Sequence, residues 1–117
     1  EFYSYEAKYI DADGATLEIP ANVDANLEKK MREAALKGYL VLNCSGLARV
    51  DFFVERNTET FYLNEINTLP GFTSISMYPK LWDKKGLSYN QLLDRLIELA
   101  FERFKERNDV YKSINID

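Results

Sequence analysis

The segment from residue 47 to residue 67 constrains the fold more than any other part of this chain. It contains two runs rich in aromatic and β-branched residues, LARVDFFV and FYLNEIN, joined by a short polar connection that includes NTET. Two such runs around a short connection are typical of a β-hairpin. The sequence therefore predicts two antiparallel strands, over roughly residues 47–54 and 60–67.

Helical patterns lie on both sides of the hairpin. From Asp24 to about Asn43, apolar residues recur at spacings of three and four, which favours a helix with Asp24 as its N-cap. Ser88 and Gln91 form a capping-box sequence for a second helix near the C-terminus. The inner face of that helix is expected to consist of Leu92, Leu93, Leu96, Ile97, Ala100 and Phe104. The predicted fold class is α+β, an antiparallel sheet flanked by helices.

Three further segments have weaker patterns. Residues 16–21, TLEIPA, alternate well enough to predict a short strand. Residues 68–87 have no clear period, so we expect a loop of ~20 residues, a length that is more often functional than idle in a compact domain. Residues 108–117 are expected to form a frayed tail.

Composition excludes several classes of protein. The 117 residues fit one compact domain, and the net charge of −4 gives no electrostatic case for binding nucleic acid or an anionic membrane. With Cys44 as the sole cysteine no disulfide framework is possible, and a cytoplasmic location is expected. Because the sequence has no histidine, Ser-His and Cys-His catalysis is excluded, and any metal must have oxygen ligands.

Polar side chains occupy alternate positions on both strands of the predicted hairpin. Arg49 and Asp51 project to one face of their strand, and Glu65 and Asn67 do the same on the other strand. In the expected register all four meet. The opposite face of the first strand takes the apolar residues Ala48, Val50, Phe52 and Val54. Carboxylate and amide oxygens suit Mg²⁺, two such ions could clamp a phosphoryl group, and an arginine beside them could bind phosphate.

These residues also allow a purely structural interpretation. An arginine and an aspartate on a hairpin often form only a salt bridge, and an asparagine at a strand end often forms only a turn. Each motif alone favours that interpretation. Together, and followed by a loop in which Gly71, Ser74 and Ser76 could approach an anion, they favour a site. Lys8 and Tyr9 are a weaker candidate pair, and Cys44 is interpreted as a packing residue.

These motifs, in this order, resemble the C-terminal part of the D-alanine–D-alanine ligases, members of the ATP-grasp superfamily. The resemblance runs through YEAKY, GLARVDFF, LNEINTLPGFTSISMYPKLW and GLSYNQLLDRLIELA. It implies that residues 1–117 form a C-terminal ATP-grasp domain, and that residues 1–15 belong to a mobile active-site loop. The chain opens on Glu1 without a recognisable start, so we expect a portion of a longer protein whose N-terminal and ATP-lid domains are missing here.

The resemblance also implies roles for individual residues. Asp51, Glu65 and Asn67 match the magnesium ligands of the family, with Glu65 bridging two ions and Mn²⁺ as an alternative metal. Arg49 matches the arginine that holds the acyl phosphate and the tetrahedral intermediate. Gly71 matches the glycine whose backbone N–H helps to form the oxyanion site.

The remaining matches concern substrate and nucleotide. Ser76 and Met77 match the pocket for the carboxylate of the second D-amino acid. Lys8 and Tyr9 match the loop that closes over phosphates and substrate, and Asn64 matches a position beside the nucleotide.

The activity implied is ATP-dependent ligation of two D-alanines for peptidoglycan precursors, through an acyl phosphate, by a cytoplasmic homodimer. Lys8 and Tyr9 argue against D-lactate as the second substrate, and Met77, where several lactate and serine variants carry arginine, favours D-alanine. The 117 residues alone are predicted not to ligate. D-alanine–D-serine ligation, another ATP-grasp carboxylate–amine ligation, and a non-catalytic α+β module that binds a partner or divalent ions stay open as alternatives.

Overall fold

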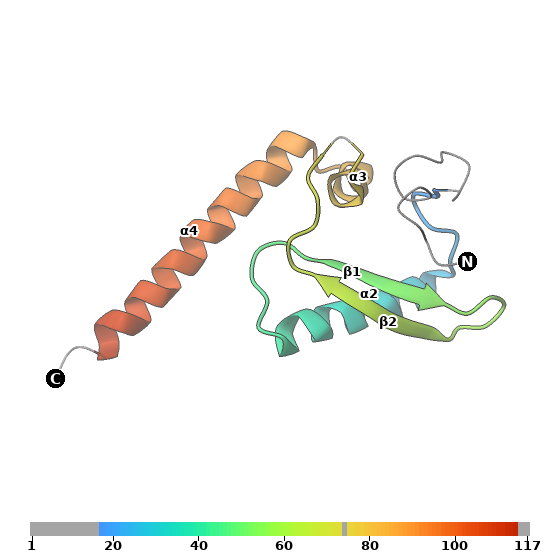
Figure 1. Ribbon diagram of the computed structural model, residues 1–117, viewed down its shortest axis with the longest axis horizontal. Helices are drawn as coiled ribbons and strands as arrows, with labels where there is room; N and C mark the ends of the chain where they lie inside the picture. Colours follow the sequence, from blue (N-terminus) through green and yellow to red (C-terminus); the bar gives the residue numbers. More distant parts are fainter. Residues whose placement is uncertain (1–16, 74, 115–117) are drawn as a thin grey trace.

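The computed structural model describes residues 17–73 and 75–114. In chain order they form helix α2 (Ala25–Val41), strands β1 (Arg49–Val54) and β2 (Phe61–Asn67), helix α3 (Met77–Lys84) and helix α4 (Tyr89–Ile114) (Figure 1). This order confirms the predicted α+β class. The predictions for Lys8, Tyr9, Ser74 and the loop of residues 1–15 concern residues outside the described ones.

Strands β1 and β2 form a two-stranded antiparallel sheet. The pairing runs from Arg49 opposite Asn67 to Val54 opposite Phe61. In the turn between them Asn57 has a φ of 66°, a left-handed conformation that asparagine tolerates better than most residues. The predicted hairpin is therefore confirmed to within two residues at each end.

The register of the hairpin shifts once, between Asp51 and Phe52. Asp51 lies opposite Glu65 but Phe52 lies opposite Leu63, so Asn64 has no opposite residue, as in a β-bulge. Side chains alternate between the faces of a strand, so the extra residue turns Leu63 to the face away from Glu65. Strand β2 therefore presents polar side chains on one face near its end and apolar side chains on the other face near its start.

Helix α2 covers the apolar face of the hairpin. The Asp24 carboxylate accepts hydrogen bonds from the backbone N–H groups of Asn26 (2.8 Å) and Leu27 (3.4 Å), which confirms Asp24 as the N-cap. A Cβ atom on Gly38 would lie 2.9 Å from Ile66 Cδ1. The glycine therefore permits a close approach between α2 and β2, and it leaves the opposite face of the hairpin free of this helix.

Helix α3 corrects the expectation of an irregular loop over residues 68–87. With eight residues it is too short to show a clear apolar period. Pro79 lies in the first turn, where its missing N–H has no intrahelical partner to lose. Gly86, with a φ of 89°, ends the segment in a Schellman arrangement, in which the Leu87 N–H donates to the Trp82 carbonyl at 3.0 Å.

Helix α4 begins at the predicted capping box. The Ser88 N–H donates to Gln91 Oε1 at 3.0 Å, and the Gln91 N–H donates back to Ser88 Oγ at 3.5 Å. The helix continues to Ile114, so residues 108–114 are helical, which corrects the expectation of a frayed tail there. No glycine or proline interrupts its sequence, so no local signal ends it earlier.

The strand expected over residues 16–21 is not formed by its described part, since residues 17–21 are irregular. Pro20 has no backbone N–H to donate, and the sheet of the described residues consists of β1 and β2. The N-terminal side of α2 is therefore approached by an irregular segment instead of a strand.

Few side chains of the described residues are deeply buried. The buried apolar residues are Leu27, Tyr78 and Leu92, with 4%, 7% and 2% of their surface exposed. Of the inner face predicted for α4, Leu92 is buried, whereas Leu93, Ile97 and Phe104 are 37%, 55% and 65% exposed. Figure 1 shows α4 running away from α3 toward the C-terminus. No helix of the described residues is long and apolar enough to cross a membrane.

Candidate active site

Four polar side chains lie on the hairpin face that points away from α2. Arg49 lies opposite Asn67, and Asp51 lies opposite Glu65, in the register that the sequence predicts. Directly opposite residues on a sheet face have Cβ atoms about 5 Å apart, close enough for their side chains to interact. The structure therefore brings together the four residues that sequence analysis proposed as one cluster.

Arg49 binds both carboxylates of this cluster. Its Nε and Nη2 donate to the two carboxylate oxygens of Asp51, each at 2.8 Å, and Nη2 also lies 3.4 Å from Glu65 Oε1. Hydrogen bonding to Asp51 raises the pKa of Arg49, with the charge of Glu65 adding to the effect. The cluster holds two carboxylates and one guanidinium, so it keeps an excess negative charge for a cation.

The donor set suits a hard cation. Asp51 and Glu65 are partly exposed, with 34% and 53% of their side-chain surface accessible, so a cation from solvent can reach their oxygens. Asn67 Oδ1 accepts one hydrogen bond, from the Leu69 N–H at 3.1 Å, and an amide oxygen has a second lone pair to offer. Among residues 17–73 and 75–114, no three His, Cys, Asp or Glu side chains gather into a metal site. The hairpin face offers two carboxylates and an amide oxygen, which are hard oxygen ligands.

The loop after β2 brings Gly71 and Ser76 together. A Cβ atom on Gly71 would lie 2.8 Å from Ser76 Oγ, too close for any other residue to fit without movement. Ser76 precedes α3 as its N-cap residue, but its side chain makes no hydrogen bond to the first turn of that helix. Met77 is the first residue of α3. An anion placed here would meet the start of a helix, whose dipole and N–H groups favour negative charge.

Aromatic side chains that sequence analysis had not singled out fix this loop. The ring of Phe72 contacts Tyr78 of α3 and Tyr89 of α4, with centroid distances of 5.6 and 5.7 Å. The Tyr89 hydroxyl donates to the Phe72 carbonyl at 3.3 Å. Burial raises the pKa of Tyr78. In the sequence these residues resemble ordinary core or capping positions, and only the fold shows that they meet.

Exposed aromatic residues continue the polar face of the hairpin. Phe53 lies opposite Tyr62, and these side chains are on the same face as Asp51 because positions two apart share a face. Their exposed fractions are 64% and 59%. Asn64, expected beside a nucleotide, is the exposed bulge residue between Tyr62 and Glu65. From the sequence, Phe53 and Tyr62 were predicted only to form strands.

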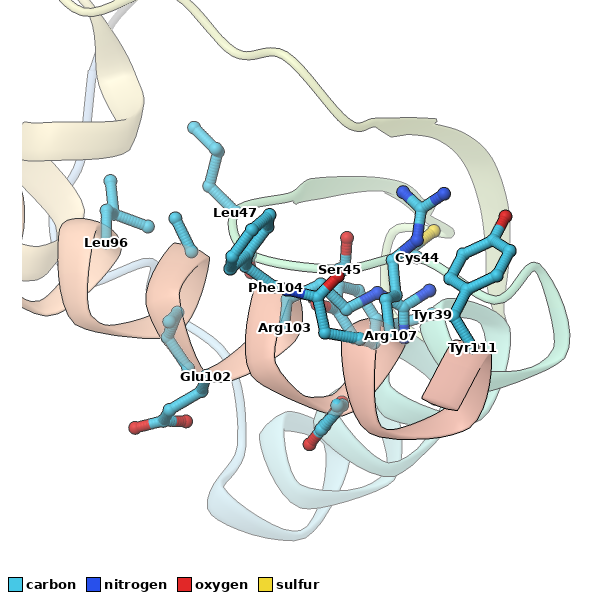
Figure 2. Close-up of a pocket in the computed structure, with 15 residues that line it drawn as sticks. Tyr39, Cys44, Ser45, Leu47, Leu96, Glu102, Arg103, Phe104, Arg107 and Tyr111 are labelled. Carbon is cyan, nitrogen blue, oxygen red and sulfur yellow. The ribbon is translucent and has the colours of Figure 1, made fainter. Parts of the chain in front are cut away.

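A cavity of about 740 Å³ lies elsewhere, between α4 and the segment that connects α2 to β1 (Figure 2). Tyr39, Cys44 and Leu47 line one side, and Phe104 and Arg107 line the other. None of the clustered hairpin residues contributes to it. The cavity is therefore separate from the polar cluster on the hairpin.

Comparison with known proteins finds relatives that match nearly the whole of this chain. A ligase from Oceanobacillus iheyensis, called D-alanine–D-alanine ligase, is 53% identical over the whole of this chain. D-alanine–D-alanine ligase A of Bradyrhizobium diazoefficiens is 54% identical over 94% of the chain. The chain covers 31% and 30% of these relatives, so it spans about a third of their length.

Solved structures define the class. The D-alanine–D-alanine ligase of Coxiella burnetii superposes with a TM-score of 0.83 at 41% identity, over 89% of this chain and 30% of that one. The Bacillus anthracis ligase complexed with ATP gives a TM-score of 0.68 at 39% identity, over 74% of this chain and 29% of that one. The fold is therefore the C-terminal portion of an ATP-grasp ligase fold.

The particular family follows from the match to a single family model. The model described as D-ala D-ala ligase C-terminus matches residues 1–98, which include the whole hairpin, the loop and α3. The chain belongs to this family.

Proposed function

We propose that this chain is the C-terminal part of an ATP- and Mg²⁺-dependent ligase that joins two D-alanines into D-alanyl-D-alanine for peptidoglycan precursors. The observation that supports this most is the joint placement of the polar cluster on the hairpin and the Gly71–Ser76 contact at the end of the same strand. A ligase of this kind needs a site for phosphoryl transfer beside a site for the second amino acid. The end of β2 carries residues suited to each.

The cation site is proposed to consist of Asp51, Glu65 and Asn67, holding two Mg²⁺ ions, or Mn²⁺, with Glu65 shared between them. When bound, the ions would neutralise charge on the phosphates of ATP. Asp51 is bound by the guanidinium of Arg49 through both oxygens, and each oxygen keeps a further lone pair that could face a cation. Arg49 would hold a phosphate with the donors that Asp51 leaves free.

The acceptor site is proposed to lie in the loop. The Gly71 N–H would donate to the oxyanion that forms when the amine of the second D-alanine attacks the acyl phosphate. Ser76 and Met77 would bind the carboxylate of that D-alanine at the start of α3. In this arrangement the protein mainly positions two reactants and stabilises charge, as expected for phosphoryl and acyl transfer.

The nucleotide is proposed to lie along the hairpin face, beside Asn64, where Phe53 and Tyr62 offer exposed aromatic surface to a base. Lys8 and Tyr9 are proposed to close over phosphates and substrate. The parent protein is proposed to be a cytoplasmic homodimer that includes an N-terminal domain and an ATP-lid domain. The 117 residues alone would not hold ATP in a reactive geometry, and so would not ligate.

The proposal is tested by measuring phosphate release from the full-length parent with ATP and Mg²⁺, with the 117-residue chain as the control. D-Alanine alone, D-alanine with D-serine, and D-alanine with D-lactate are compared, and the products are identified by mass. We expect turnover with D-alanine alone and none from the short chain. A D-alanyl-D-serine product in the mixture would instead assign the acceptor as D-serine, and no turnover with any D-amino acid would refute the ligase assignment.

A further inference from the structure

Thr73 makes two hydrogen bonds to the hydroxyl group of Ser76. The Thr73 N–H donates to Ser76 Oγ at 2.9 Å, and the Thr73 hydroxyl oxygen lies 2.8 Å from the same atom. In the reverse direction, the Ser76 N–H donates to the Thr73 carbonyl at 3.0 Å. A single residue therefore holds both the side chain and the backbone of Ser76.

These contacts leave two arrangements for the proton of Ser76, because either hydroxyl of the pair can donate to the other. A serine hydroxyl has one proton and two lone pairs. If the Thr73 N–H occupies one lone pair and the Thr73 hydroxyl donates into the other, the Ser76 proton is left to donate outward. An ionised carboxylate accepts hydrogen bonds and cannot donate them, so a carboxylate bound to Ser76 would select this orientation.

The peptide group between Phe72 and Thr73 is fixed at both ends. Its N–H is the donor to Ser76 Oγ, and its carbonyl accepts the Tyr89 hydroxyl at 3.3 Å. The ring of Tyr89 also packs against Phe72 at a centroid distance of 5.7 Å. The distance of 3.3 Å is long for a hydroxyl–carbonyl hydrogen bond, so the contribution of Tyr89 should be the weaker of the two.

We propose that Thr73 is a positioning residue for the acceptor substrate: it directs the Ser76 hydroxyl toward the substrate carboxylate and holds it beside Gly71. Tyr89 supports it by fixing the orientation of the peptide group that precedes Thr73. A Cβ atom on Gly71 would lie 2.8 Å from Ser76 Oγ, so the serine hydroxyl lies directly beside the glycine. This inference rests on the proposed function, because it names the substrate group that Ser76 meets.

The test uses Thr73→Val in the full-length protein, which removes the hydroxyl and keeps the shape and the backbone N–H. We expect the KM of the acceptor site to rise about fivefold, as for the loss of one hydrogen bond, with the KM for ATP and the melting temperature unchanged. Thr73→Ser should restore the KM. Thr60→Val, the same chemical change at the far end of the hairpin, is the matched control. Tyr89→Phe should give a smaller rise than Thr73→Val.

A double-mutant cycle separates positioning from general structure. In a Ser76→Ala background there is no hydroxyl to direct, so Thr73→Val should have no further effect on the KM of the acceptor site. Additive effects of the two substitutions would overturn the inference. An unchanged KM in Thr73→Val, or a parallel loss of all kinetic constants with a lower melting temperature, would do the same. A wild-type protein without D-alanine-dependent turnover would refute the proposed function itself, and the inference with it.

Discussion

The loop of residues 67–76 and the outer half of helix α4 are organised in opposite ways. In the loop, short polar contacts and aromatic packing hold the chain. The Leu69 N–H donates to Asn67 Oδ1, and the Thr73 N–H donates to Ser76 Oγ. In α4, Phe101 and Phe104 are 69% and 65% exposed. The site region is held by contacts among the described residues, whereas the described residues leave much of the apolar face of α4 exposed.

The loop and the apolar face of α4 are therefore specified by the sequence in two different ways. The loop is specified by groups a few residues apart, together with Tyr89. The apolar face of α4 is specified by its spacing alone, which predicts burial but does not name what covers it. Relatives are about three times as long as the chain, and under the proposed function their additional domains would supply that cover.

The largest effect is expected from the polar cluster. Asp51→Asn or Glu65→Gln in the full-length protein should lower kcat/KM for ligation by about a thousandfold, about 4 kcal/mol in the barrier, because the cation ligands lose charge. Glu59→Gln, at an exposed carboxylate near the hairpin turn that pairs with Lys30, is the control and should change little. Initial rates at several Mg²⁺ concentrations provide the measurement. Equal losses in all three variants would contradict the assignment of the cluster.

The next effect contrasts the two regions directly, by urea unfolding of the 117-residue chain. Leu92→Ala should lower the free energy of unfolding by about 3 kcal/mol, because Leu92 is 2% exposed and its loss leaves a cavity. Ile97→Ala, further along the same helix and 55% exposed, should cost less than about 0.5 kcal/mol. In the full-length protein the cost of Ile97→Ala should rise toward that of Leu92→Ala. Equal costs in the short chain would show that the α4 face is already covered.

A smaller effect is expected at the close contact in the loop. Gly71→Ala places a methyl group 2.8 Å from Ser76 Oγ, so the serine must shift. Ligation should slow by about tenfold to a hundredfold, with the loss falling on the acceptor step and not on the KM for ATP. Gly46→Ala serves as the comparison for glycine replacement, although its φ of 71° adds backbone strain, so it should destabilise without this kinetic signature. A loss confined to the KM for ATP would contradict the placement of Gly71.

The smallest effect is a dependence of stability on alkaline pH. Burial raises the pKa of Tyr78 above its ordinary value of 10.0, so the folded state keeps a proton that the unfolded state releases. The stabilisation is complete below pH 10.0 and is lost as pH rises through the folded-state pKa. Tyr78→Phe should flatten this decline in unfolding measurements between neutral and alkaline pH, and Tyr111→Phe, at an exposed tyrosine, should not. An unchanged slope in Tyr78→Phe would mean that its hydroxyl is not the group responsible.

Much of the architecture could be predicted from the sequence, for physical reasons that can be stated. Alternation along β1 and β2 determines which side chains share a face, so the meeting of Asp51 with Glu65 followed directly from the expected hairpin register. The N-cap at Asp24 and the capping box at Ser88 are local hydrogen-bond patterns that the sequence displays in full. The hairpin register and the two helix caps could therefore be predicted from local sequence patterns.

Other features were not accessible, because they depend on groups that meet only in the fold. Helix α3 was missed since eight residues give too little periodicity and Pro79 suggested a break. The bulge at Asn64 has no sequence signal of its own, and the contact between Phe72 and Tyr89 joins residues 17 positions apart. The roles of Arg49 and Gly71 in the reaction are implied by the family resemblance and stay predictions.

The bulge at Asn64 has a consequence for how this chain can change length over evolution. With the extra residue, Glu65 and Asn67 lie on the polar face while Leu63 packs toward α2. Deleting Asn64 would remove the bulge and leave both halves of β2 on their present faces, because Leu63 and Glu65 would then alternate regularly. Deleting Leu63 instead would leave Asn64 to face α2. A deletion at Asn64, or in the turn around Asn57, should therefore be tolerated better than a deletion at Leu63.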